Sequence, residues 1–222
     1  MNIAKYIDHT CLKVDATLKD IEKLCNEAIE KGFYSVCVNP AYVSHALGFL
    51  SGTDIKVCSV VGFPLGSSTV QTKVYEAVNA IDDGADEIDM VMNIGYFKSG
   101  FFHLVKNEIE RVRSVIRDSV LKVIIESSIL TDDEIEKAVK ICIESGADYV
   151  KTSTGFSNGG ATEKTVEIIK KASQGSKIKI KASGGIKDRK TAERYIELGV
   201  ERIGTSSGIA ILESIEIENG SY

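Results

Sequence analysis

Two lysines occupy segments that otherwise have the composition of buried β-strands. Lys151 lies in the run Tyr149-Val150-Lys151-Thr152, and Lys181 lies in Ile180-Lys181-Ala182-Ser183. An ammonium group is rarely fully buried without a partner, because its transfer out of water is costly. Burial and a nearby positive charge both lower the pKa of a lysine. Because a neutral amine can attack a carbonyl group, these lysines predict Schiff-base chemistry.

A carboxylate occupies a third apolar segment. Asp89 lies between Ile88 and Met90, where it is poorly solvated unless it faces a cavity or a cation. A buried salt bridge to a lysine and a proton-handling role are both compatible with this position. The same lysine–aspartate contact would serve either role.

The alternation of side chains along a strand predicts where the lysines point. Lys151 points away from the face that carries Val150 and Thr152, and therefore into the interior if those two residues face helices. Lys181 and Lys179 share one face, and Lys181 is favoured because active sites form at the carboxyl ends of parallel strands. Lys179 is expected to lie a layer deeper or to be paired.

Two glycine-rich turns follow the last two expected strands. Gly184-Gly185 precedes a helix start at Ile186-Lys187-Asp188, and Gly204-Thr205-Ser206-Ser207-Gly208 leads into the last helix. Backbone N–H groups in such turns and at helix N-termini bind anions, and a phosphate is often held there in barrels. Each glycine pair alone is more typical of an ordinary turn, but the two placements together predict a phosphate site.

Strand and helix patterns alternate along the whole chain. Capping signals at Thr17, Thr131 and Asp188 precede helical apolar patterns, and a glycine follows the helix at Gly32 and at Gly199. Apolar runs without alternation predict strands covered on both faces, at 6–10, 33–38, 55–61, 87–93, 121–126, 149–154, 178–183 and 201–205. Eight strands with helices between them predict an α/β fold, a single (β/α)8 TIM barrel, with a doubly wound open sheet as the alternative.

Composition limits the classes of partner. The chain has 222 residues with a net charge of −5, which fits one domain over 1–222 and disfavours nucleic acid or an anionic membrane as a partner. No 18-residue apolar stretch or signal peptide is present. Five scattered cysteines indicate reduced thiols in a cytoplasmic protein. The three histidines lack metal-ligand spacing, so a metal site is not expected.

Five segments together make the chain similar to the deoxyribose-phosphate aldolases, a family of class I aldolases. Lys-Thr-Ser-Thr-Gly followed about thirty residues later by Lys-Ala-Ser-Gly-Gly is highly specific for the family, and the similarity runs from residue 6 to residue 222. The segments are Ile7-Asp8-His9-Thr10, Glu87-Ile88-Asp89-Met90-Val91, 150–156, 181–185 and 204–207.

The resemblance implies a TIM barrel that cleaves 2-deoxy-D-ribose 5-phosphate to D-glyceraldehyde 3-phosphate and acetaldehyde, without metal or other cofactor. Lys151 would form the Schiff base, and Lys181 would lower the pKa of Lys151 and relay protons with Asp89 through water. The expected tail 214–222 is mobile, and its terminal Tyr222 would assist proton transfer. The substrate and its phosphate would contact Thr10, Gly155, Gly184, Gly185, Lys187, Gly204, Ser206 and Ser207. Family members are often dimers or tetramers, which makes a homodimer or homotetramer the expected assembly.

Two other classes remain open on the residues alone. A phosphosugar isomerase or synthase would use Asp89 as a base without a covalent step, and borohydride would not inactivate it. A non-catalytic sugar-phosphate sensor would bind the pentose phosphate and release no aldehyde. Glu126 and Cys37 are further residues that could line the site, although Cys37 is also typical of a small core thiol.

Overall fold

The computed structural model describes residues 2–214, which alternate between strands and helices. The strands are β1 Ile7–Cys11, β2 Ser35–Val38, β3 Lys56–Val61, β4 Glu87–Val91, β5 Val120–Ile124, β6 Tyr149–Lys151, β7 Lys179–Ser183 and β8 Arg202–Thr205. The α-helices are α1 Leu18–Lys31, α2 Val43–Phe49, α3 Val70–Asp82, α4 Ile94–Lys98, α5 Phe102–Val115, α6 Asp132–Glu144, α7 Glu163–Ala172, α8 Arg189–Glu197 and α9 Gly208–Glu213. Short 3-10 helices cover η1 Ile3–Tyr6, η2 Pro40–Tyr42 and η3 Ser127–Ile129.

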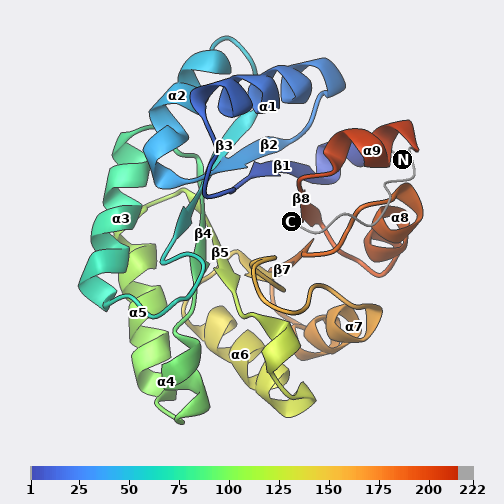
Figure 1. Cartoon of the computed structure of the whole chain (residues 1–222). Coiled ribbons are helices and arrows are strands. Elements are labelled where there is room, and N and C mark those ends of the chain that lie inside the picture. Colours follow the sequence, from blue (N-terminus) through green and yellow to red (C-terminus); the bar gives the residue numbers. More distant parts are fainter. Residues whose placement is uncertain (1, 215–222) are drawn as a thin grey trace.

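The strands form a closed parallel barrel in the order β1 to β8. The barrel closes where β1 pairs with β8, with Ile7 opposite Ile203 and Asp8 opposite Gly204. The helices form a ring around the strands (Figure 1). The predicted (β/α)8 barrel is therefore confirmed, and the open doubly wound sheet is wrong.

All eight predicted strands exist, but several end earlier than expected. The segment expected as 149–154 is a strand only over Tyr149–Lys151, and 87–93 is a strand only as far as Val91. The residues that follow make other bonds. Thr154 donates through its backbone and its side chain to Glu126, and Asn93 accepts a hydrogen bond from the N–H of Tyr96 as the N-cap of α4. The strands therefore stop where polar side chains begin to capture the backbone.

Local signals account for the helix ends. Thr17 and Asp20 form a reciprocal capping box at the start of α1, and Thr131 and Glu134 do the same for α6. Asp188 accepts a hydrogen bond from the N–H of Thr191 at 2.8 Å at the start of α8. Gly32 ends α1 with a left-handed φ of 68°, a conformation that a residue with a Cβ adopts at a cost.

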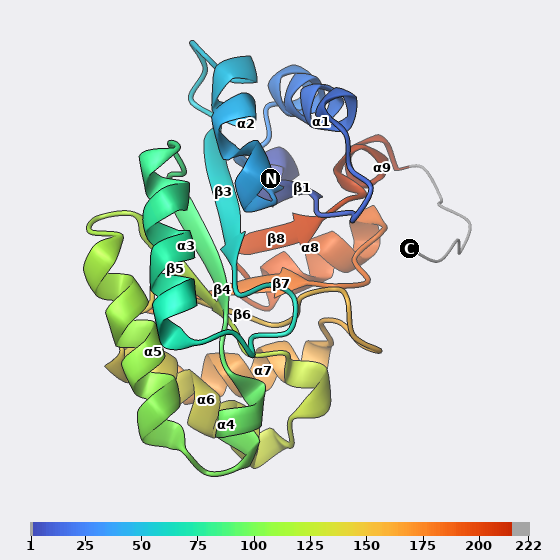
Figure 2. The same ribbon diagram turned by 60° about the vertical axis from the view of Figure 1, so that its left-hand side comes forward.

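A buried ion pair joins two neighbouring helices to the strand that carries Asp89. The helices α3 and α5 lie side by side in both views (Figures 1 and 2). Between them Lys73 contacts Glu108 at 2.7 Å and donates to the carbonyl of Val91 at 2.8 Å, while Glu108 accepts from the N–H of Asn93. Burial lowers the pKa of Lys73 and raises that of Glu108. The pair therefore fixes the carboxyl end of β4.

The apolar core lies mainly between the strands and the helices. Residues such as Val150, Ile180 and Ile203 pack there against the helices. A smaller apolar group of Leu12, Cys37, Cys58 and Val60, with Phe63 packed against it, is separate from this core. Among residues 2–214 no helix is long and apolar enough to span a membrane.

Candidate active site

Seven charged side chains meet inside the barrel, and all are almost completely buried. They come from β1, β4, β5, β6, β7 and β8, and contact one another through ion pairs. The residues are Asp8, Glu87, Asp89, Lys122, Lys151, Lys181 and Arg202. We call them the interior ion cluster.

Asp89 lies at the centre of the interior ion cluster. Its Oδ2 atom accepts hydrogen bonds from the Nζ atoms of Lys151 at 2.8 Å and Lys181 at 2.7 Å. Its Oδ1 atom accepts from Lys122 Nζ at 2.8 Å and from Cys58 Sγ at 3.2 Å. Burial alone would raise the pKa of Asp89, but the three ammonium groups hold it well below its ordinary value. Asp89 is therefore a carboxylate held between two predicted catalytic lysines.

Lys181 is fully buried and contacts two carboxylates, Asp89 and Asp8. Their charges raise its pKa above the ordinary value despite the opposing effect of burial. Arg202 holds the other oxygen of Asp8 at 2.7 Å and also contacts Glu87. These partners fix Lys181 as an ammonium group.

Lys122 and its partner Glu87 extend the cluster beyond the residues expected from the sequence. Lys122 Nζ lies 2.6 Å from Glu87 Oε2 and 2.8 Å from Asp89 Oδ1. The carboxylates raise its pKa well above the ordinary value, although burial opposes this. Lys122 lies in the apolar run Leu121-Lys122-Val123, which is the same signal that singled out Lys151 and Lys181.

Lys151 is less tightly held than the other two lysines. Among residues 2–214 its ammonium nitrogen pairs with Asp89 Oδ2 alone, and that oxygen also accepts from Lys181. The side chain is 3% exposed, whereas Lys122 and Lys181 are 0% exposed. Val150 packs in the helix-facing core, so Lys151 points inward as the strand alternation predicted. Lys179 is half-exposed and pairs with Glu201 at 3.5 Å outside the interior cluster.

Two small hollows lie at the carboxyl end of the barrel, and Thr154 and Phe156 line both. One, of about 60 Å³, is also lined by Thr10, Leu12 and Ser206. The other, of about 180 Å³, includes Glu126, which sequence reasoning had placed near the site. Phe156 contacts Phe63 edge to face, with ring centroids 5.2 Å apart.

The turn after β7 lies against the loop after β6. A Cβ added to Gly160 would lie 2.2 Å from the carbonyl oxygen of Gly184, so these two backbones touch directly. This close approach is a structural reason for Gly184. A Cβ added to Gly185 would meet no atom within 4 Å, which leaves its backbone accessible to a ligand. Gly155 lies at the start of the same β6 loop, and Lys187 is half-buried after the turn.

The turn after β8 contributes differently from what the sequence indicated. A Cβ added to Gly204 would lie 3.0 Å from Cε of Lys181, so Gly204 makes room for that side chain. The N–H of Ser207 donates to Thr205 Oγ1 at 2.9 Å, while the side chain of Ser207 makes no capping hydrogen bond at the start of α9. At α8 the carboxylate of Asp188 already accepts from a helix N–H, so this start is less suited to an anion.

Potential metal ligands come together at one place in residues 2–214. One ligand atom from each of Cys37, Cys58 and Asp89 lies within 4.8 Å of the others. The histidine spacing could not reveal this group, because it arises from neighbouring strands. A cation there would have to displace the ammonium groups that already contact Asp89. Of the predicted mobile tail 214–222, all residues after Ser214, including the predicted Tyr222, lie outside the described residues.

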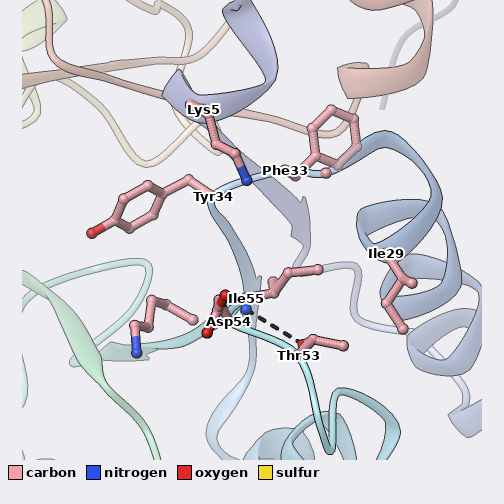
Figure 3. Close-up of a pocket in the computed structure, with 9 residues that line it drawn as sticks. Lys5, Ile29, Phe33, Tyr34, Thr53, Asp54 and Ile55 are labelled. Atoms are coloured by element: carbon pink, nitrogen blue, oxygen red, sulfur yellow. Dashed lines mark hydrogen bonds between the residues drawn. The ribbon is translucent and has the colours of Figure 1, made fainter.

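A third hollow, of about 390 Å³, lies at the opposite end of the barrel (Figure 3). Its lining includes Lys5, Tyr34, Thr53 and Ile55, which lie before the amino ends of β1, β2 and β3. Like the linings of the two smaller hollows, its lining includes no residue of the interior ion cluster, so its position in the barrel decides between them. Since active sites of barrels form at the carboxyl ends of the strands, the two smaller hollows mark the entrance to the site.

Comparison with known proteins supports one family. The DeoC/LacD family aldolase profile matches residues 2–214. The deoxyribose-phosphate aldolase from Brevibacillus brevis is 50% identical to the chain, and the match covers 100% of both sequences. The deoxyribose-phosphate aldolase from Geobacillus sp. is 52% identical, and the match covers 100% of this chain and 99% of that protein. The solved structure of QR15, an aldolase, has a TM-score of 0.91 at 47% identity, covering 95% of this chain and 94% of that one. A tetrameric deoxyribose phosphate aldolase from Aeropyrum pernix has a TM-score of 0.87 at 33% identity, covering 96% and 90%.

Proposed function

Because the chain belongs to the DeoC/LacD family of aldolases and is therefore a lyase, we propose that it reversibly cleaves 2-deoxy-D-ribose 5-phosphate in deoxyribose phosphate catabolism. The products are D-glyceraldehyde 3-phosphate and acetaldehyde, formed through a Schiff base on Lys151. The substrate follows from the names of the relatives. The observation that carries the choice of residue is the position of Lys151 in the interior ion cluster.

The balance of charge supports Lys151 as the nucleophile. When every member of the cluster is ionised, four cations face three carboxylates in a water-poor interior. Loss of one proton removes the excess positive charge. Lys122 and Lys181 are each held by two close carboxylates, whereas Lys151 shares one oxygen with Lys181. Lys151 is therefore the amine that the carboxylates of the cluster hold least tightly, which suits it to act as the nucleophile.

The proposed reaction uses the cluster in three steps. The neutral amine of Lys151 adds to C1 of the open-chain substrate, and loss of water gives an iminium ion. A water held by Asp89 and Lys181 removes the proton from the C3 hydroxyl, and the C2–C3 bond breaks with its electrons drawn toward the iminium. This bond is fixed by carbon balance, since acetaldehyde has two carbons and glyceraldehyde 3-phosphate has three. Protonation and hydrolysis then release acetaldehyde.

Asp89 is suited to this sequence because it stays negative throughout. An iminium nitrogen on Lys151 keeps one N–H and one positive charge, so its contact with Asp89 Oδ2 is retained. The carboxylate therefore stabilises the cationic intermediate after the nucleophile has reacted. Lys181 remains protonated beside it and supplies a positive charge near the C3 oxygen.

The phosphate is proposed to lie at the turns after β6, β7 and β8. The open backbone at Gly185 and the first turn of α9, which the Ser207 side chain does not cap, offer N–H donors. Gly155, Ser206 and Lys187 complete this site, and Thr10 lines the hollow beside it. Such remote binding orients the sugar over Lys151.

Borohydride trapping tests the proposed nucleophile. Acetaldehyde plus borohydride should leave one ethyl group on Lys151, found by peptide mass mapping. The matched control is Lys179→Ala, which removes a half-exposed lysine on β7 and should leave the adduct unchanged. A Lys151→Ala protein that still forms one stoichiometric adduct would exclude the assignment. A phosphosugar isomerase with Asp89 as base would form no adduct at all.

A homodimer or homotetramer is the proposed assembly, supported by the tetrameric relative from Aeropyrum pernix. Light scattering on the purified chain measures it directly. A monomer at micromolar concentration contradicts this part of the proposal and leaves the chemistry untouched.

A further inference from the structure

Two buried thiols beside the interior ion cluster have no part in the proposed aldol reaction. Cys37 on β2 and Cys58 on β3 are register partners on neighbouring parallel strands, and both are 0% exposed. Register partners on adjacent strands point to the same face. Cys58 Sγ lies 3.2 Å from Asp89 Oδ1 and 3.3 Å from Lys122 Nζ, which places this face toward the cluster.

The two sulfur atoms are close enough to join. Their separation is no more than 4.8 Å, and neighbouring strands lie about 4.8 Å apart, inside the Cα range of known disulfides. Side chains on directly paired strands stand farther apart at Cβ than an unstrained disulfide requires, so a bond formed here would be readily reduced. The geometry is that of a labile dithiol.

We propose that Cys37 and Cys58 form a reversible disulfide that switches the active site off under peroxide. The first thiolate attacks hydrogen peroxide, so that an S–O bond forms, the O–O bond breaks and hydroxide leaves. The second thiol then attacks the sulfenic sulfur, an S–S bond forms and water leaves. Two thiols and one peroxide thereby give one disulfide and two waters, and a dithiol reductant reverses the change.

Cys37 is suited to react first. The hydrogen bond from Cys58 lowers the pKa of Cys37, whereas burial raises that of Cys58 well above its ordinary value. The ammonium group of Lys181 also favours a thiolate at Cys37. Cys58 then acts as the resolving thiol.

The disulfide would disturb the reaction because Cys58 contacts the central carboxylate. Oxidation removes its S–H group and draws the sulfur away from Asp89 Oδ1 and Lys122. Loss of a hydrogen bond to a charged group costs about tenfold in rate when it occurs at the reacting centre. Oxidation should therefore lower activity without removing Lys151.

Peroxide treatment of the full chain tests the proposal. We expect the intact mass to fall by two hydrogens, peptide mapping to find a Cys37–Cys58 cross-link, and the rate of aldehyde release to fall about tenfold. Dithiothreitol should restore the rate. The control Cys142→Ala, which removes a buried thiol on α6, should lose activity under peroxide as the wild type does. After the same treatment, Cys37→Ala and Cys58→Ala should each retain the activity that they had before it.

Three results would overturn the switch. The first is a peptide map of the peroxide-treated protein without the Cys37–Cys58 cross-link, and the second is a cross-link that leaves the rate of aldehyde release unchanged. The third is a Cys58→Ala protein that loses activity under peroxide as the wild type does. The rate measurement rests on the proposed function, but the cross-link does not. If the chain lacks aldolase activity, peptide mapping of the wild-type protein still decides whether the dithiol forms.

Discussion

Replacement of two lysines of the interior ion cluster by methionine should have opposite consequences for stability and activity. Lys151→Met should abolish aldehyde release and leave the melting temperature nearly unchanged. Lys122→Met should lower the melting temperature strongly. Both residues lie inside the same barrel and both contact Asp89, so the pair of variants is matched in burial and in chemistry.

The magnitude follows from the carboxylate oxygens that each change leaves behind. Without Lys151, Asp89 Oδ2 still accepts from Lys181 at 2.7 Å. Loss of Lys151 also leaves three cations facing three carboxylates in the cluster. Without Lys122, Asp89 Oδ1 keeps only the Cys58 thiol, and Glu87 keeps only Arg202. Leaving a buried charge without its partner costs about 3–5 kcal/mol, whereas a well-packed apolar replacement of an expendable group costs about 1 kcal/mol or less.

Thermal unfolding followed by circular dichroism measures the difference. For a domain of this size the Lys122→Met variant should melt roughly 10 °C below the wild type, and Lys151→Met within about 3 °C of it. Equal destabilisation of the two variants would refute the reasoning, because it would mean that the cluster depends on Lys151 as much as on Lys122. The melting temperature of Lys151→Met thus tests, without substrate, how little the cluster depends on this lysine.

Three further outcomes are expected. Gly204→Ala places a Cβ 3.0 Å from Cε of Lys181 and should lower kcat about tenfold with KM unchanged. The control Gly48→Ala, whose Cβ meets no described atom within 4 Å, should keep wild-type kinetics. Equal kcat values for the two variants would show that Gly204 does not position Lys181. Burial lowers the pKa of His9 despite its contact with Glu27 at 2.7 Å. As the pH falls, the histidine of the unfolded chain, with a pKa of about 6.5, therefore takes up a proton before folded His9 does. The contribution of neutral His9 to the free energy of unfolding is thus fully present above pH 7 and decreases below it, by at most about 1.4 kcal/mol at pH 5.5. Denaturant unfolding at pH 7 and pH 5.5 should show this loss of stability in the wild type and in the control His103→Asn, which replaces an exposed histidine. The loss should be absent in His9→Asn, and an unchanged loss there contradicts the assignment to His9. Tyr222→Phe should slow deuterium exchange at the acetaldehyde methyl group about a hundredfold without changing the Lys151 adduct, and exchange at the wild-type rate would remove Tyr222 from the mechanism.

The parts of the fold that could be predicted are those with local causes. The capping boxes at Thr17 and Thr131 act over three residues, and Gly32 ends its helix through its own backbone conformation. Eight apolar runs separated by such helices were enough to predict the barrel. The ends of the strands were less predictable, because Glu126 comes from another strand end to bind Thr154, and no pattern near residue 154 records that contact.

The site shows the same division between local and long-range information. A lysine in an apolar strand is a local signal, and it led to Lys151 and Lys181. Lys122 carries the same signal but does not lie at the carboxyl end of a glycine-flanked strand, so it was not singled out. The partners of these lysines depend on closure of the barrel, since Lys181 binds Asp8 across 173 positions and Arg202 binds Asp8 across 194.

Closure of the barrel explains why one amine in the cluster differs from the others. Parallel strands bring charged groups from six strands to one axis, where each ammonium needs carboxylates and each carboxylate needs donors. Asp8, Glu87 and Asp89 supply enough oxygens to hold Lys122, Lys181 and Arg202 with two carboxylates each. Lys151, on the short strand β6, receives only an oxygen that is already shared. A network that holds three cations with two carboxylates each leaves the fourth, Lys151, with the fewest contacts to give up when its nitrogen bonds to a carbonyl carbon, as a Schiff-base lysine must.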